Sequence, residues 1–234
     1  MRPRPWHGVG GWLVAVLAGL APVPAWSQDL PTIVARINGT VITRAQLEAR
    51  LTQSRSMNPE RFDDMTTAER RRAMLRTLDS IVVREIEVQE AEKRGITVAD
   101  EELDRDLNEL KALAGTRGGL ETLLAEYGTT LDEWMAETRR NHMIRELEQA
   151  EAWKLPVSES EVRDEFERNF WREAHRPPDT VIAEHRDHMK EVIRQRRWSA
   201  SRREWLRPLI EAATIWRWTP GAQMHESSGF ADPP

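Results

Sequence analysis

The sequence contains no cysteine among its 234 residues. The chain can therefore form no disulfide, carries no thiol nucleophile and offers no cysteine for attachment of a lipid. Any fold that it adopts must be held together by the packing of its core alone.

Glycine and basic blocks are scarce as well. With only 12 glycines, the composition favours long helices over an all-β sandwich. The formal net charge is −5 and no run of lysine and arginine dominates, so no nucleic-acid partner is predicted. The nearest candidate is "ERRRAMLR", residues 69–76, and its helical spacing favours a solvated helix face over a phosphate site.

Long apolar runs are missing except at the N-terminus. Arg2 and Arg4 precede the short apolar core "VGGWLVAVLAGLAPVPA", and "AWS" places the small residues Ala25 and Ser27 just before Gln28. This order is typical of a cleavable signal peptide, predicted here as residues 1–27. A membrane anchor is the less favoured alternative, because the run is shorter than the ~20 residues that span a bilayer. No later stretch of the sequence predicts an integral membrane segment.

Motifs for catalysis are also missing. The sequence has no glycine-rich phosphate loop, no nucleophile elbow and no HExxH motif, so no catalytic residue and no cofactor is predicted. His185 and His188, with Glu184 beside them, have the spacing of metal ligands, but a chance pair on an exposed helix is the favoured interpretation. The acidic run at 100–102 is better explained by helix capping than by acid–base catalysis.

A β-hairpin is predicted at the start of the mature chain. Residues 34–42 alternate apolar and polar side chains around Asn38-Gly39, which suits a two-residue turn. Thr43 and Gln46 then form a capping box that predicts a helix. Because a lone hairpin is marginal in water, it needs a further strand or a covering helix. The alternating segment "ATIWRW" near the C-terminus can supply that strand.

Helical patterns fill the rest of the chain. Thr66 and Glu69 form a second capping box, and Leu78, Val82 and Ile86 then step by four residues. They predict a helix roughly 40 Å long. Further helices are predicted at about 100–114, 120–127, 131–153, 158–170 and 181–212.

The elements together predict a mainly α, elongated, multi-helix domain over residues 28–218. Its small sheet consists of the N-terminal hairpin and the C-terminal strand. Pro208 lies inside the last predicted helix and predicts a kink or a split near Trp205. Residues 219–234 are predicted to be a disordered tail.

Tryptophan is frequent, with 10 residues beside one tyrosine and four phenylalanines. Core packing is the favoured interpretation, and an apolar cleft for extended chains is the alternative. The methionines leave the same choice open. Met57 and Met65 flank a loop with Phe62, and flexible thioethers suit both promiscuous contacts and the filling of gaps.

The order of these segments resembles the SurA-type periplasmic chaperones, and more loosely the parvulin-class foldases and the trigger-factor chaperone module. "IVARINGTVITRAQLEARL" is similar to the family's opening hairpin and first helix. The segments from "AERRRAMLRTLDS" to "DEFERNF" are similar to its following helices, and "VIRQRRWSASRREWLRPLIEAATIWRW" is similar to its closing helix and strand. The resemblance covers an N-terminal part at 33–170 and a returning part at 181–218.

The resemblance implies a chaperone of the bacterial periplasm that works without ATP. It would hold unfolded or partly folded envelope proteins, including outer-membrane barrel precursors, in an apolar cleft beside the long helix. The candidate client-binding residues are Met57, Phe62, Met65, Tyr127 and Trp134. The sequence leaves open whether a homodimer closes this cleft.

The sequence departs from the family at its catalytic domain. Such foldases usually carry a parvulin prolyl-isomerase domain after the segment ending near Phe170, where this chain has only "WREAHRPPDT". A domain needs upwards of ~50 residues. The sequence therefore predicts the chaperone part without the enzyme. A residual prolyl isomerase and a dedicated interaction subunit of an envelope or export complex are the two alternatives.

Overall fold

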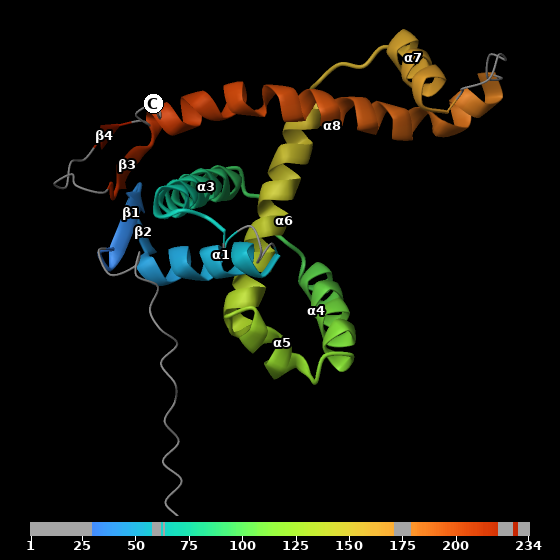
Figure 1. Cartoon of the computed structure of the whole chain (residues 1–234). Helices are drawn as coiled ribbons and strands as arrows, with labels where there is room; N and C mark the ends of the chain where they lie inside the picture. Colours follow the sequence, from blue (N-terminus) through green and yellow to red (C-terminus); the bar gives the residue numbers. More distant parts are fainter. Residues whose placement is uncertain (1–29, 58–61, 63, 171–178, 220–226, 229–234) are drawn as a thin grey trace, which may run out of the picture.

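The computed structural model describes residues 30–57, 62, 64–170, 179–219 and 227–228. Helices dominate this part of the chain, which confirms the predicted mainly α class (Figure 1). In chain order the elements are β1 (Ile33–Ile37), β2 (Thr40–Thr43), α1 (Arg44–Met57), α3 (Thr67–Lys93), α4 (Asp100–Gly115), α5 (Leu120–Glu126), α6 (Leu131–Trp153), α7 (Glu159–Phe170), α8 (Asp179–Ala212), β3 (Thr214–Arg217) and β4 (Ser227–Ser228).

Four helices start at the capping boxes that the sequence contains. Before α3, the Thr66 hydroxyl accepts a hydrogen bond from the Glu69 N–H (3.3 Å). The Glu69 carboxylate in turn accepts one from the Thr66 N–H (2.8 Å). The same reciprocal pair precedes α1, α6 and α7. Each box satisfies two N–H groups that the first helical turn leaves without a partner, so the helix starts could be predicted locally.

The sheet brings the two ends of the described chain together. β1 pairs with β2 across Asn38-Gly39, whose φ angles of 48° and 94° are the positive values that a tight hairpin turn requires. On its other side β1 pairs antiparallel with β3, with Arg36 opposite Trp216. The strand order is β2-β1-β3-β4. The two-residue β4 thus adds a fourth strand to the three predicted, within the segment 219–234 for which disorder is expected.

The main core lies between the sheet, α1, α3 and the end of α8. The predicted stripe on α3 is buried, since Leu78, Val82 and Ile86 are at most 4% exposed. Ile37 of β1 and Ile215 of β3 belong to the same apolar cluster. The strands near both ends of the described chain therefore enclose one core, which is how a protein without disulfides anchors them.

α8 continues through Pro208 without a break, so the predicted split near Trp205 is wrong. Pro208 is exposed, and its ring therefore does not disturb the core. Leu206 is buried before it, and Leu209 and Ile210 pack against the main core after it. Packing on both sides of the proline holds the helix together despite the hydrogen bond that a proline removes.

Two smaller units extend from this core. α4, α5 and the start of α6 share an apolar cluster of their own around Leu123 and Leu124. α7 lies along the half of α8 that is remote from the sheet (Figure 1). α6 runs from α5 up to α8 and connects both units to the body of the molecule (Figure 1). The result is the elongated, multi-helix arrangement that the sequence predicts.

Candidate functional site

The residues proposed from the sequence lie in two different surroundings. Phe62 and Met65 belong to the connection between α1 and α3. Tyr127 and Trp134 belong to the unit of α4, α5 and α6. Met57 is the last residue of α1, and its side chain lies outside the described part of the structure.

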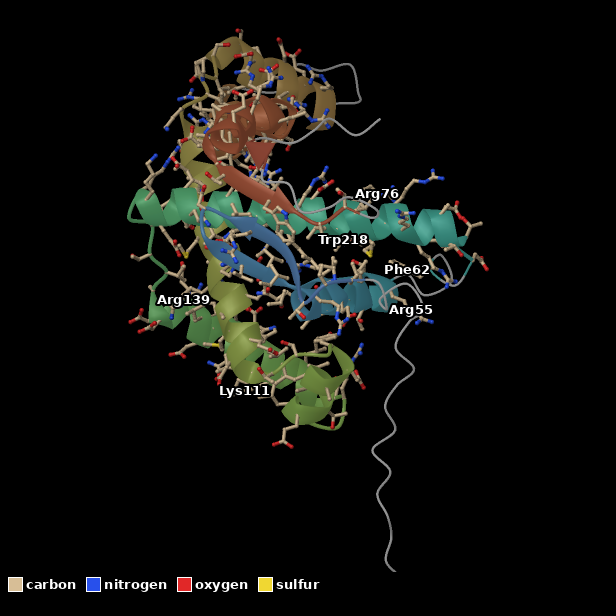
Figure 2. The ribbon with its side chains drawn as sticks, turned by 90° about the vertical axis from the view of Figure 1, so that its left-hand side faces the viewer. Arg55, Phe62, Arg76, Lys111, Arg139 and Trp218 are labelled. Atoms are coloured by element: carbon tan, nitrogen blue, oxygen red, sulfur yellow. The ribbon has the colours of Figure 1, made fainter. Side chains whose placement is uncertain are left out.

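A hollow of about 440 Å³ lies at the start of α3. Phe62 lies near it, between the end of α1 and the first turns of α3 (Figure 2). Its side chain is partly buried, and its carbonyl accepts a hydrogen bond from the Met65 N–H (3.4 Å). The residues that line the hollow are Asp64, Met65, Glu69, Arg72 and Arg76. One methionine thus lies among two carboxylates and two guanidinium groups.

Glu69 has a fixed charge and a fixed position in this hollow. Hydrogen bonds from the hydroxyl and the backbone N–H of Thr66 lower the pKa of its carboxyl group, so it is ionised at neutral pH. Arg72 and Arg76 lie one turn apart on the same face of α3. The mixed charges do not select a partner of one sign. They suit a polypeptide backbone, whose carbonyl groups can accept hydrogen bonds from the arginines beside an apolar contact.

Tyr127 and Trp134 take part in packing. Both are partly buried against the cluster formed by Leu110, Ala114, Leu123 and Leu124. Part of each ring is left at the surface, on the same unit as Leu113, whose side chain is 43% exposed. The structure therefore places these two aromatic residues in a separate apolar cluster from the hollow, with packing as their first role.

The other tryptophans that the structure describes are divided between core and surface. Trp198 and Trp216 are buried, and Trp198 packs edge-on against Trp205 with ring centroids 5.2 Å apart. Trp153 is different, because it is 54% exposed and carries the Arg194 guanidinium 4.0 Å above its ring. The sequence contains no signal that separates Trp153 from the packed tryptophans.

Among the residues that the structure describes, no group of three His, Asp or Glu side chains is arranged to hold a metal ion. His185, a candidate ligand from the sequence, instead packs edge-on against Phe166 at 5.9 Å. Within the same described ranges, no helix is long and apolar enough to span a membrane.

The sequence profile of the SurA-like N-terminal domain matches residues 9–148, which is more than half of the chain. The chain belongs to this SurA-like family. The matched stretch contains the hollow and the α4–α5 unit and ends within α6, so α7 and α8 lie beyond it.

Curated relatives carry the name Chaperone SurA. The protein of Chromobacterium violaceum is 30% identical over 152 residues, which are 63% of this chain and 34% of the relative. The protein of Chromohalobacter salexigens is 27% identical over 165 residues, 69% of this chain and 37% of the relative. The protein of Xanthomonas euvesicatoria is 26% identical over 163 residues, 68% and 35% of the two chains. The chain thus spans about a third of the length of the curated SurA relatives that it matches.

The charged lining of the hollow is the part that sequence reasoning missed. Arg72 and Arg76 belong to the run at 69–76, and both are exposed, as the predicted solvated helix face requires, while they also line the hollow. Their spacing of four residues is the signal that puts both on one side of the helix. Nothing in the sequence indicates that the connection from α1 brings Met65 to that same side.

Proposed function

We propose that this chain is an ATP-independent chaperone of the bacterial periplasm that holds unfolded or partly folded envelope proteins. The observation that carries the proposal is the SurA-like N-terminal domain over residues 9–148, together with relatives named Chaperone SurA. The signal-peptide pattern at 1–27, which lies outside the described residues, supports export. A role for ATP has no support in the sequence, which contains no phosphate-binding loop.

The hollow at the start of α3 supports client binding at Phe62 and Met65. An apolar client side chain would bury surface against these two residues, while Arg72 and Arg76 donate hydrogen bonds to the client backbone. Binding at one such site is weak, because the client loses conformational freedom whenever it is ordered. Weak, reversible contacts are what a holding chaperone requires, since the client must leave again in order to fold.

We infer that the chain acts without prolyl-isomerase activity. Residues 171–178 are all that separates α7 from α8, the position at which the related foldases carry their parvulin domain. This segment is far shorter than the ~50 residues that an independent domain needs. A proline-peptide turnover assay should therefore give the uncatalysed rate, and accelerated turnover would contradict the inference.

An aggregation assay tests the chaperone proposal directly. A urea-unfolded outer-membrane barrel protein and an unrelated soluble protein are each diluted into buffer with and without the chain that starts at Gln28. Light scattering is then followed in the absence of ATP. We expect near-stoichiometric amounts of the chain to suppress scattering of the barrel protein. No suppression with either client would contradict the proposal and would favour a dedicated subunit for one folded partner.

The double substitution Phe62→Ser and Met65→Ser tests the site. We expect client affinity to fall about tenfold, which corresponds to ~1.4 kcal/mol, because two apolar contacts are lost. The free energy of unfolding should change by less than ~1 kcal/mol, since both side chains are already partly exposed. Affinity is measured by fluorescence anisotropy of a labelled unfolded client, and stability by urea unfolding.

Leu113→Ser is the matched control for that variant. Leu113 is an exposed apolar residue on α4, away from the hollow. Its replacement should leave client affinity unchanged. If the Phe62 and Met65 variant also binds the client as tightly as the unaltered chain, the hollow is not the binding site.

A further inference from the structure

α7 is attached to the molecule through α8. Val162 and Phe166 of α7 meet Met189 and Ile193 of α8, and all four side chains are at most 3% exposed. In each helix the two residues are four positions apart, so they form one stripe along the helix. Figure 1 shows α7 beside the half of α8 that is remote from the sheet, α1 and the α4–α5 unit.

Acidic residues of α7 and basic residues of α8 flank this apolar contact. The pairs are Glu159 with Arg186 (3.0 Å) and Lys190 (2.7 Å), Glu161 with Arg197, and Glu165 with Arg196 (2.5 Å). Glu165 is buried, and the Arg196 guanidinium closes over it from the solvent side. α8 thus presents an apolar strip with basic residues on its flanks, and α7 is a segment of complementary chemistry.

The contact between α7 and α8 is small compared with the rest of the protein. Its cluster has four buried apolar residues among those described, whereas the main core has 13. The Glu159–Arg186 pair is largely exposed and the Glu161–Arg197 pair is partly exposed, and salt screens exposed pairs. An element with little buried apolar surface and screened ion pairs opens at a lower free energy than the core does.

We propose that α7 detaches from α8 as a unit and that the uncovered strip on α8 binds an acidic, amphipathic segment of a client. The strip, here called the α8 strip, consists of Met189 and Ile193 with the flanking basic residues Arg186, Lys190, Arg196 and Arg197. α7 is then an internal competitor that keeps the strip covered while no client is present. That the bound segment belongs to a client rests on the proposed chaperone function, whereas the existence of the α8 strip as a binding site does not.

The side chains of α7 indicate which client segments fit the α8 strip. A client segment that fits has two apolar side chains one helical turn apart, which take the positions of Val162 and Phe166. Its carboxylates on either side contact the basic residues that flank the strip. A basic amphipathic segment would place cations against the arginines of α8 and is rejected. α7 and α8 lie beyond the stretch that the SurA-like profile matches.

A peptide with the sequence of α7 and its approach, residues 156–170, is the direct probe. The labelled peptide is titrated with the unaltered chain and with the variant Val162→Ser, Phe166→Ser, and anisotropy is recorded. We expect the variant to bind the peptide at least about tenfold more tightly, because its own α7 no longer competes. Adding Met189→Ser and Ile193→Ser to the variant should abolish binding. Equal affinity for the unaltered chain and the variant, or no binding by the variant, would overturn the proposal.

Two controls keep the result interpretable. A peptide with lysine in place of Glu159, Glu161 and Glu165 should not bind, which separates charge complementarity from general stickiness. In the unaltered chain, hydrogen exchange should be faster in α7 than in α3 and should accelerate further at high ionic strength. If α7 exchanges as slowly as α3 at every ionic strength, it does not detach, and the proposal fails without any variant.

The peptide experiment contains no client. Its failure would therefore leave the chaperone proposal standing. If the chain binds the peptide but does not suppress aggregation, the proposal of the α8 strip stands and the chaperone proposal fails.

Discussion

The Leu78→Ala variant is expected to lose about 3 kcal/mol of unfolding free energy. Leu78 lies on α3, is 1% exposed and belongs to the cluster that joins the sheet to the helices. Truncation removes buried apolar atoms and leaves a cavity that its tightly packed surroundings only partly refill. The chain has no disulfide to offset the loss. Urea unfolding followed by circular dichroism measures the change.

Leu113→Ala supplies the control with the same chemistry. Leu113 lies on α4 and is 43% exposed, so its truncation removes little buried surface. We expect a change below about 0.5 kcal/mol. Similar losses for the two variants would show that Leu78 does not lie in a close-packed core.

Leu78 also illustrates what the sequence predicts well. Its burial follows from the spacing of Leu78, Val82 and Ile86, and the helix start follows from Thr66 and Glu69. Both signals depend only on residues a few positions apart, so they predict local structure independently of contacts with the rest of the chain. The hairpin at Asn38-Gly39 belongs to the same class. For such elements the sequence alone is sufficient to predict the structure.

The features that the sequence does not predict depend on contacts between residues far apart in the chain. Pro208 predicts a kink or a split, but its neighbours pack against the core and α8 continues through it as one helix. The packing of Trp134 against the α4–α5 unit depends on residues distant in the sequence, and its role as a client contact stays a prediction. Met65 could be named from its loop, whereas the role of Arg72 beside it needs the path of the chain from α1 to α3. No local pattern carries that information.

The junction of α8 with α3 and α6 is the clearest case of this limit. Arg202 of α8 donates hydrogen bonds to the carboxylates of Glu87 on α3 and Glu148 on α6. Glu87 precedes Arg202 by 115 positions and is fully buried. Within the part of the chain that the structure describes, its Oε2 atom has no hydrogen-bond partner. Burial raises the pKa of Glu87, and the Arg202 guanidinium opposes that rise.

Replacing Arg202 by methionine is expected to cost about 3 kcal/mol of unfolding free energy at neutral pH. The loss of the guanidinium leaves the buried Glu87 carboxylate without its counter-charge. The cost lies at the low end of the range for broken buried pairs, because about a third of the Arg202 side chain (35%) is exposed. The double variant Arg202→Met, Glu87→Gln removes the unpaired charge and should recover most of the loss.

The dependence of that loss on pH shows whether charge is its cause. The pKa of Glu87 is raised above its ordinary value of 4.5 in the folded protein, and removing Arg202 raises it further. A carboxyl group of this kind favours the folded state fully below the unfolded pKa, and that contribution is lost as the pH rises through the folded pKa. Arg202→Met should therefore cost little near pH ~4 and most at neutral pH, whereas the double variant should show no such trend. An equal loss at both pH values would mean that Arg202 holds α8 by the packing of its stem and not by its charge.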